Sequence, residues 1–343
     1  MIAYYLPQFY TFPQNDEWWG HGFTEWTNVR RAKPQYCGHS QPRYPMPKLG
    51  YYDLSSNEVF HKQITLAKAF GLYGFCFYFY MFNKNTRMLE NPIDNYLNDK
   101  SLDFPFCLMF VNESWTRSWE SNSSEILVKQ EYIANYEYHL ALELKKYLLD
   151  DRYIWVNGKP LVIIYRVHLL PNKELFSTLF REHCFTLGIG EIYLCSCFTN
   201  GGNDATQYGF DDNSEFPPHN TPKLELKDID KFQTFKGKVF SYQKVLDESI
   251  QKKYSFPMLR GAMVGWDNTP RRLNEASIFY GSYPDAFQFW LENLIIQTRE
   301  LRSEPEQIIF INSWNEWAEG SYLEPDLHNG YNYLQAIKNS LRI

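Results

Sequence analysis

The sequence predicts an α/β fold, and within that class a (β/α)8 TIM-type barrel. Strand-like and helix-like segments alternate along the chain, which is typical of βαβ units and a parallel sheet. The strand-like segments number eight, as a barrel requires. The length of 343 residues is compatible with one α/β barrel. We therefore expect residues 1–343 to form a single catalytic barrel with a long, aromatic-rich loop after the first strand, at about 7–54.

The predicted strands are short and apolar on both faces, as buried parallel strands are. The run from Gly74 to Tyr80 is an example. The eight expected strands span residues 2–6, 74–80, 104–111, 161–165, 191–195, 210–216, 258–266 and 308–312.

The predicted helices follow from capping residues and apolar periodicity. Ser55 or Ser56 can cap a helix that runs to Ala69 and ends at Gly71. Apolar or aromatic residues at 133, 136, 140 and 144 share one face of another helix. Further helices are expected from about 91 onward and at 131–149, 176–187, 242–253, 285–302 and 330–341, with an ordered loop at 220–238.

A doubly wound open sheet is the competing fold. Its nucleotide-binding versions carry G-x-G-x-x-G or G-x-x-x-x-G-K-[ST] after a strand. Neither pattern follows any of the predicted strands. The barrel is therefore the favoured prediction.

The bulk composition excludes several classes of partner. The formal net charge of -6 gives no basic surface for nucleic acid. No apolar run reaches the ~18–20 residues of a membrane span, and Met1 is not followed by a signal peptide, so we expect a cytoplasmic protein. The six cysteines are expected to be reduced and mostly buried, and no metal or other cofactor is expected. No oligomeric state is predicted.

Aromatic residues make up 18% of the chain, with 10 Trp and 26 Tyr. Part of this content must form the core, because aromatic side chains dominate buried area. The remainder suits a site that stacks on the flat faces of sugar rings. An oligosaccharide or polysaccharide is therefore the expected partner.

Polar and aromatic residues follow most of the predicted strands. In a barrel, catalytic groups collect at the carboxyl ends of the strands, and binding sites combine aromatic walls with a few convergent polar groups. The candidate catalytic residues are Glu316 and Glu319. The candidate substrate-binding residues are Gln8, Trp18, Trp19, Glu25, Trp26, Asn83, Asn112, Glu113, Trp115, Arg166, Glu215, Trp266, Asp267, Trp314 and Asn315.

Glu316 and Glu319 stand three residues apart just beyond the last strand. In a helical turn they would share a face, whereas in a strand they would point in opposite directions; we expect the helical turn. Two neighbouring carboxyl groups suit glycosyl transfer, and their repulsion would raise the pKa of one of them. The alternative is that a helix N-terminus favours glutamate through its dipole. Spacing alone leaves both explanations open.

Several long motifs resemble those of the WbsX-like family, which is itself similar to glycoside hydrolase family 99, the endo-α-mannosidases. The resemblance covers nearly the whole chain. It rests on Tyr5-Leu6-Pro7-Gln8-Phe9, Trp18-Trp19-Gly20, Phe23-Thr24-Glu25-Trp26-Thr27-Asn28, Gly265-Trp266-Asp267-Asn268-Thr269, Trp314-Asn315-Glu316-Trp317-Ala318-Glu319-Gly320 and Leu323-Glu324-Pro325.

The resemblance implies a (β/α)8 barrel and a retaining reaction without an enzyme nucleophile. By this likeness Glu316 takes the proton from the substrate's 2-hydroxyl, whose oxygen attacks C1 to form a 1,2-anhydro sugar. Glu319 acts first as acid and then as base. The substrate must carry a 2-hydroxyl trans to the leaving group, as α-mannosides and α-rhamnosides do, and no metal is needed.

Two other functions are alternatives to the hydrolase. The WbsX-like group is described as glycosyltransferases of surface polysaccharide assembly, such as O-antigen, lipopolysaccharide or capsule biosynthesis. The D-x-D motif of many nucleotide-sugar transferases is matched in letters by Asp228-Ile229-Asp230, but in a charged segment away from any strand, so we interpret it as coincidence. The third function is a non-catalytic protein that binds glycans through its tryptophans.

Overall fold

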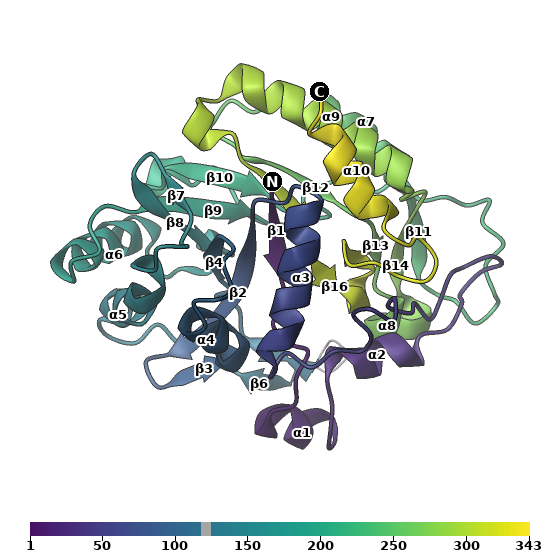
Figure 1. Ribbon diagram of the computed structural model, residues 1–343, viewed down its shortest axis with the longest axis horizontal. Coiled ribbons are helices and arrows are strands. Elements are labelled where there is room, and N and C mark those ends of the chain that lie inside the picture. The colour runs from purple at the N-terminus through teal and green to yellow at the C-terminus, as the bar shows by residue number, and fades with distance from the viewer. Residues whose placement is uncertain (118–124) are drawn as a thin grey trace.

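The computed structural model describes residues 1–117 and 125–343. In this part of the chain, eight parallel strands form a barrel with helices around it (Figure 1). The strands are β1 (Ile2–Tyr5), β2 (Gly74–Asn83), β4 (Phe106–Phe110), β8 (Lys159–Ile164), β9 (Tyr193–Phe198), β10 (Asp212–Glu215), β12 (Arg260–Met263) and β15 (Ile309–Asn312). Each predicted strand coincides with one of them, so the predicted (β/α)8 barrel is confirmed.

The strands are hydrogen-bonded in the order β10-β9-β8-β4-β2-β1-β15-β12. The ends of this sheet meet at a parallel bridge between Ser214 and Leu259. There the Glu215 N–H donates to the Leu259 carbonyl at 2.9 Å, and the Leu259 N–H donates to the Asn213 carbonyl at 2.7 Å. The barrel is therefore nearly closed, with its thinnest seam between β10 and β12.

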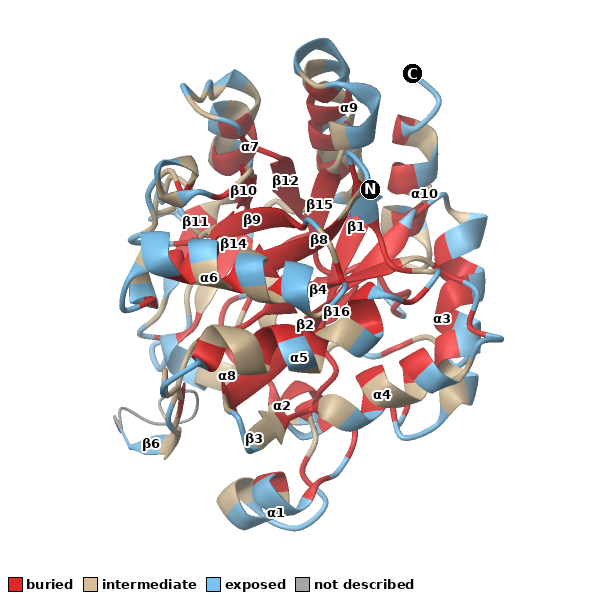
Figure 2. Cartoon of the chain, turned by 90° about the vertical axis from the view of Figure 1, so that its left-hand side faces the viewer, coloured by how far each residue is buried: buried red, intermediate tan, exposed pale blue. Residues whose placement is uncertain are grey.

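Helices cover the outside of the barrel and turn their buried faces toward the strands (Figure 2). They are α3 (Asn57–Ala69), α4 (Glu90–Asn98), α5 (Tyr136–Leu148), α6 (Lys173–Thr186), α7 (Tyr242–Gln251), α9 (Pro284–Leu301) and α10 (Asn332–Ser340). Each corresponds to a predicted helix. Within the described residues between β9 and β10, the 3-10 helix η3 (Thr206–Tyr208) takes the place of an α-helix.

Helix α3 shows why these segments fold as they do. The hydroxyl of Ser56 accepts a hydrogen bond from the Glu58 N–H at 3.3 Å and so caps the first turn. Phe60 and Ile64 lie one turn apart and are buried against the barrel. Gly71, at a φ of 85°, lets the chain turn back toward β2.

Aromatic side chains fill both sides of the strands. Inside the barrel, Tyr4 stacks on Phe310 at a centroid distance of 5.1 Å and meets the edge of Phe216 at 4.7 Å. Outside it, the next residue, Tyr5, packs against Phe60 of α3 at 5.8 Å. This alternation follows from the two-residue period of a strand. Much of the high aromatic content is therefore core.

The segment between β1 and α3 was predicted as one long loop, but it contains two short helices. They are α1 (Pro13–Trp19) and α2 (Glu25–Arg31). Thr24 precedes α2 and exchanges hydrogen bonds with the third residue of that helix in a capping box. In Figures 1 and 2 both helices lie at the end of the barrel that also carries α8 (Thr269–Arg272).

All six cysteines are free, and only Cys37 is exposed. The prediction of buried thiols therefore holds for the other five. Among the residues that the structure describes, none of the helices combines the length and the apolar character needed to cross a bilayer.

Candidate functional site

The turn that carries Glu316 and Glu319 is a small hairpin beyond β15. Strands β16 (Asn315–Glu316) and β17 (Ser321–Tyr322) pair antiparallel, and the 3-10 helix η6 (Trp317–Glu319) joins them. The Ser313 hydroxyl donates to the Ser321 carbonyl at 2.6 Å and accepts from the Glu316 N–H at 2.8 Å. The predicted helical turn is present as one 3-10 turn, in which Glu316 is the N-cap residue and Glu319 the last residue.

Buried polar contacts fix this hairpin from beneath. Asn315 exchanges hydrogen bonds with the backbone of Leu6 at 2.8 and 2.9 Å, which ties the hairpin to the end of β1. Trp317 stacks on Tyr322 at 3.8 Å, and its indole N–H donates to Glu324 at 2.7 Å. The positions of the two glutamates therefore depend on side chains that face away from them.

Glu324 is a buried carboxyl group beneath the hairpin. Besides Trp317, it accepts hydrogen bonds from Gln63 at 2.7 Å and Tyr52 at 2.9 Å. Burial raises the pKa of Glu324 to about 7, against the lowering effect of its hydrogen-bond donors. This group therefore gains or loses its proton near neutral pH.

Glu316 and Glu319 face a cavity of about 260 Å³ at the carboxyl end of the barrel. Its walls combine aromatic side chains with an equal or larger share of polar and charged groups, and such convergent polar groups fix the orientation of a bound ligand. The other lining residues are Leu6, Gln8, Tyr78, Tyr80, Met109, Val111, Glu113, Ser114, Trp115, Thr116, Tyr165, Arg166, Phe216, His219, Trp266 and Arg271.

The guanidinium of Arg271 lies among three carboxylates. It approaches Glu319 at 2.5 Å, Glu316 at 3.2 Å and Glu25 at 3.2 Å. We call these four residues the cavity cluster. Arg271 comes from α8 and Glu25 from α2, so the segment after β1 and the segment after β12 both reach the hairpin. Three carboxyl groups share one guanidinium, which leaves negative charge in excess.

This excess is reflected in the protonation of the pair. Burial, followed by the charge of Glu319, raises the pKa of Glu316 well above its ordinary value, although Arg271 and a hydrogen bond with Tyr78 oppose the shift. Burial also raises the pKa of Glu319, with Arg271 opposing it and Glu25 adding to it. Two carboxyl groups in this environment retain a proton more strongly than free glutamate does.

A second polar group lines the same cavity. The Arg166 Nε lies 2.9 Å from a Glu113 carboxylate oxygen, and burial raises the pKa of Glu113 despite the charge of Arg166. Burial, helped by the charge of Arg166, lowers the pKa of His219 to about 4. His219 is therefore a neutral imidazole at neutral pH, with one ring nitrogen that donates and one that accepts.

The structure brings together seven of the predicted site residues at this cavity. They are Gln8, Glu113, Trp115, Arg166, Trp266, Glu316 and Glu319. Glu25 adjoins them through Arg271. Trp18 meets the edge of Trp115 at 6.0 Å, and Trp19 lies 5.2 Å from the guanidinium of Arg117.

Other predicted site residues are packed in the core or make structural hydrogen bonds. Trp314 is fully buried and packs on Phe75 at 5.0 Å, and Trp26 is buried against Trp317 at 5.3 Å. Three amides make structural contacts instead of facing the cavity. Asn83 donates to Glu131, Asn112 exchanges hydrogen bonds with the backbone of Arg166, and Asn315 bonds Leu6 as described above.

The structure places Glu215 and Asp267 away from the cavity to which the sequence analysis assigned them. Ser214 points into the barrel toward Tyr4, so Glu215, the next residue, points outward. Its carboxylate lies 3.1 Å from Arg260 and lines a separate cavity of about 480 Å³ outside the barrel wall. Asp267 is buried behind the hairpin. In both cases strand direction or a local turn decides the orientation, and the sequence pattern does not contain that information.

Arg271 and the tyrosines at 78, 80 and 165 also line the cavity but were not predicted as site residues from the sequence. Tyr78 and Tyr80 stand two residues apart on β2, so their side chains share the face of the strand that lines the cavity. That spacing could have identified them. Arg271 follows the Trp266-Asp267 motif by a few residues, and a cation beside two buried carboxylates is what electrostatics requires.

Residues 1–337 match the family model described as glycosyltransferase WbsX. Two relatives, both named uncharacterized protein WxcX, come from two strains of Xanthomonas campestris pv. campestris and are 38% and 37% identical to the chain over 344 residues. These alignments cover 99% of this chain and 49% of each relative. The chain therefore spans about half the length of the curated relatives it matches.

Solved structures with a similar fold include carbohydrate-active enzymes. The GH99 endo-α-mannosidase from Bacteroides thetaiotaomicron, in complex with BIS-TRIS-propane, superposes with a TM-score of 0.61 at 13% identity and covers 99% of this chain and 96% of the enzyme. A structure named glycoside hydrolase-like protein has a TM-score of 0.57 at 14% identity, with 97% and 100% covered. At such low identity these likenesses establish the barrel fold.

Proposed function

The chain belongs to the glycosyltransferase WbsX family, and from this premise we propose that it is a carbohydrate-active enzyme. Its proposed reaction is the retaining cleavage of an α-linked glycan of manno or rhamno configuration, in the assembly or processing of a surface polysaccharide. Glu316 and Glu319 are its proposed catalytic residues.

One observation carries this proposal. Glu316 and Glu319 emerge from one turn into an aromatic-lined cavity and contact the same guanidinium. Aromatic walls such as Trp115 and Trp266 suit the apolar faces of sugar rings, and the carboxyl groups suit the hydroxyls and the glycosidic oxygen.

In the first proposed step, Glu316 takes the proton of the 2-hydroxyl while O2 attacks C1. The bond between C1 and the glycosidic oxygen breaks, and Glu319 gives its proton to that oxygen. In the second step, Glu319 takes a proton from water, whose oxygen attacks C1 and opens the anhydro ring. Glu316 then returns its proton to O2. Two inversions at C1 give net retention.

The exposure of the two side chains supports this division of roles. The side chain of Glu316 is 6% exposed and that of Glu319 is 22% exposed. The group that protonates a departing sugar and then activates water must be accessible to both, which fits Glu319. The roles also require the proton on Glu319, whereas burial favours protonation of Glu316 more strongly. A bound 2-hydroxyl that donates to Glu316 would stabilise its carboxylate and correct this balance.

A glycosyltransferase is the second candidate function, because the family model is described by that activity. The same two steps would serve if an acceptor sugar hydroxyl replaced water. Exclusion of water from the cavity would then direct the reaction.

The roles of the two glutamates can be separated with substrates of different leaving groups. We expect Glu319→Gln to lower turnover of α-mannan oligosaccharides or α-rhamnosides by ~10² or more. We expect it to retain far more activity on α-mannosyl fluoride, because fluoride departs with little help from an acid. Glu316→Gln should lose activity on both substrates, since O2 must be deprotonated in each case.

Proton NMR of the first anomer released, on the same substrates, should show the α product. Equal losses by both variants on the fluoride, or a β product, would refute the assigned roles. Calorimetric binding of GDP-mannose or dTDP-rhamnose, without turnover of free glycans, would favour the transferase. Glycan binding without any product would favour a non-catalytic protein.

A further inference from the structure

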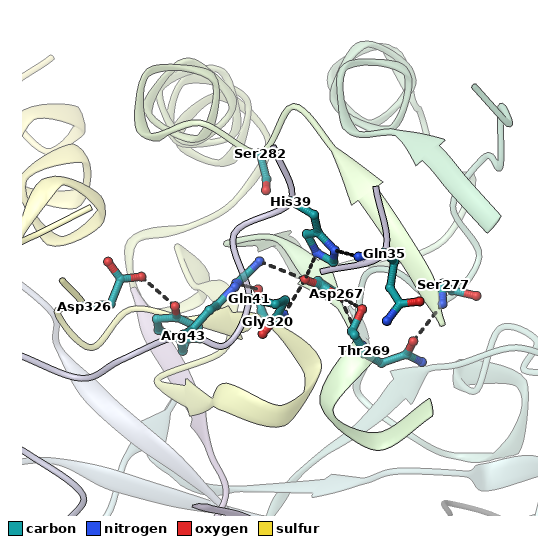
Figure 3. A network of polar contacts seen from close by, with 12 residues as sticks. Gln35, His39, Gln41, Arg43, Asp267, Thr269, Ser277, Ser282, Gly320 and Asp326 are labelled. Atoms are coloured by element: carbon teal, nitrogen blue, oxygen red, sulfur yellow. Dashed lines mark hydrogen bonds and ion pairs between the residues drawn. The ribbon is translucent and has the colours of Figure 1, made fainter. Parts of the chain in front are cut away.

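A second buried cluster lies directly behind the hairpin, centred on Asp267. It includes His39, Gln41 and Arg43 from the segment after β1, and Thr269 from the start of α8 (Figure 3). We call these five residues the buttress. The side chain of Asp267 is 2% exposed, and it is surrounded by donors.

The two oxygens of Asp267 have different partners. Oδ2 accepts from Gln41 at 2.6 Å, from His39 at 2.8 Å and from Arg43 at 3.3 Å. Oδ1 accepts from the backbone N–H and the hydroxyl of Thr269, at 3.1 and 2.6 Å. One carboxylate therefore joins the segment after β1 to the helix that carries Arg271.

The tautomer of His39 is fixed by its neighbours. Its Nδ1 accepts from the Gln35 backbone N–H at 3.1 Å, so the proton lies on Nε2 and points to Asp267. The ring stacks on Tyr36 at 4.4 Å, which holds its plane. His39 is therefore a rigid donor to Oδ2.

Arg43 connects the buttress to the catalytic turn. Its Nη1 donates to the Gly320 carbonyl at 3.1 Å, on the residue that follows Glu319. Gly320 has a φ of 61°, and a Cβ there would lie 2.8 Å from the Asp267 Cβ and 2.9 Å from Arg43 Nη1. The turn therefore packs directly on the buttress, and glycine is required at this position.

From this geometry we propose that Asp267 is a positioning residue for the reaction assigned above to Glu316 and Glu319, and the proposal rests on that function. Through Oδ1 it sets α8 and hence the guanidinium of Arg271. Through Oδ2 and Arg43 it sets the peptide after Glu319. The two oxygens of Asp267, which we call its two arms, thus determine the 2.5 Å contact between Arg271 and Glu319.

Two substitutions test the two arms. Both oxygens of Asp267 accept hydrogen bonds, whereas the amide of Asp267→Asn has one oxygen that accepts and one NH2 group that donates. In either orientation of the amide, the NH2 group therefore points at hydrogen-bond donors, either those of His39, Gln41 and Arg43 or those of Thr269. Thr269→Val keeps the shape of the side chain and the backbone N–H but removes the 2.6 Å hydrogen bond from the hydroxyl. A misplacement of about 1 Å can lower activity by ~10², so we expect Asp267→Asn to lower kcat by 10- to 100-fold and Thr269→Val by less.

A merely structural role would lower the amount of folded enzyme without these kinetic effects. We expect the KM of both variants for α-mannosyl fluoride to stay within about threefold, and the pH optimum of kcat to move, because Arg271 tunes the pKa of both glutamates. Asp150→Asn is the matched control. Asp150 is also buried and pairs with Arg152 at 2.8 Å, but it precedes β8 at the opposite end of the barrel. It should lower the melting temperature and leave kcat and its pH optimum unchanged.

Hydrogen–deuterium exchange separates this proposal from the proposed function. Residues 266–273 and 313–323 should exchange faster in Asp267→Asn than in the wild type, while β1 stays protected. A kcat within threefold of the wild type, or unchanged exchange in both segments, would overturn the proposal. If the wild type turns over none of the glycans, the proposed function fails, and the exchange data alone decide whether Asp267 positions these two segments.

Discussion

The cavity cluster and the buttress are built from similar residues but have opposite electrostatics. In the cavity cluster, three carboxylates share one guanidinium, and burial raises the pKa of Glu316 and Glu319. In the buttress, one carboxylate receives five hydrogen bonds. Burial on its own would raise the pKa of Asp267, but the hydrogen bond from His39 and the charge of Arg43 outweigh it and hold the pKa well below its ordinary value.

Both groups of carboxylates are buried, so the supply of hydrogen-bond donors distinguishes the reactive carboxylates from the structural one. A carboxylate with all its oxygen lone pairs satisfied has nothing to offer a substrate and serves as a fixed point. A group of carboxylates with too few donors holds a proton and can exchange it. The buttress packs against the hairpin whose other side carries Glu316 and Glu319. The fully hydrogen-bonded buttress therefore supports the cavity cluster.

The largest effect should come from removing the only cation of the cavity cluster, in Arg271→Met. Three carboxyl groups would then lie together without a counter-charge, and the pKa of Glu316 and Glu319 would rise further. Because a protonated Glu316 cannot take the proton of the 2-hydroxyl, we expect kcat on α-mannosyl fluoride to fall by ~10² or more, with a partial return of activity as the pH rises.

Arg271→Lys is the matched variant, because it keeps the charge but loses the planar fork that reaches three partners. It should lie between the wild type and Arg271→Met in kcat measured over the same pH range. If Arg271→Met keeps the pH optimum of the wild type, the guanidinium does not set the protonation of the pair.

The next effect is on stability, through Glu324 beneath the hairpin. Its pKa is raised from 4.5 in the unfolded chain to about 7 in the folded protein. Between these values the folded state holds a proton that the unfolded state has lost, so the free energy of unfolding falls as pH rises from 4.5 to 7. The full change is about 3 kcal/mol at most.

The contribution of Asp267 to the free energy of unfolding should depend on pH in the opposite sense. Because its pKa is lowered in the folded protein, this contribution is present above the pKa of the unfolded chain and is lost as the pH falls. Urea unfolding between pH 4.5 and 8.5 tests Glu324, since Glu324→Gln cannot ionise. The difference in unfolding free energy between Glu324→Gln and the wild type should shift in favour of the variant as pH rises. Parallel curves would show that Glu324 does not titrate in this range.

The barrel could be predicted because its signals are local. Each strand is a continuous apolar run such as Gly74 to Tyr80, and each helix has a cap or a periodic face, as Ser56 and Phe60 show for α3. Helices α1 and α2 were missed because they are short and lie in a segment whose aromatic residues show no helical period. Helix α2 packs against the hairpin and α8, and Trp18 of α1 packs against Trp115.

The candidate site was predicted in part for the same reason. Residues that directly follow a strand, such as Gln8, Trp266 and Glu316, were placed at the mouth because strand ends converge there. Arg271 reaches the cavity only because α8 folds back over it, and Asp267 turns away because Thr269 and Arg43 hold it from behind. Such orientations depend on contacts between segments more than 200 residues apart in the chain, and no local pattern encodes them.

The smallest effect should come from Glu25→Gln, which removes one negative charge from the cavity cluster and keeps an oxygen that can accept from Arg271. The charge of Glu25 contributes to the raised pKa of both Glu316 and Glu319, so both should fall. We expect the two limbs of the pH profile of kcat/KM to move to lower pH by less than about one unit, with kcat at the optimum changed only a few-fold. Glu215→Gln is the control, because Glu215 is also buried and paired with an arginine but faces the outside of the barrel. If both variants leave the profile in place, the excess charge of the cavity cluster does not tune the catalytic pair, and the contrast with the buttress is one of geometry alone.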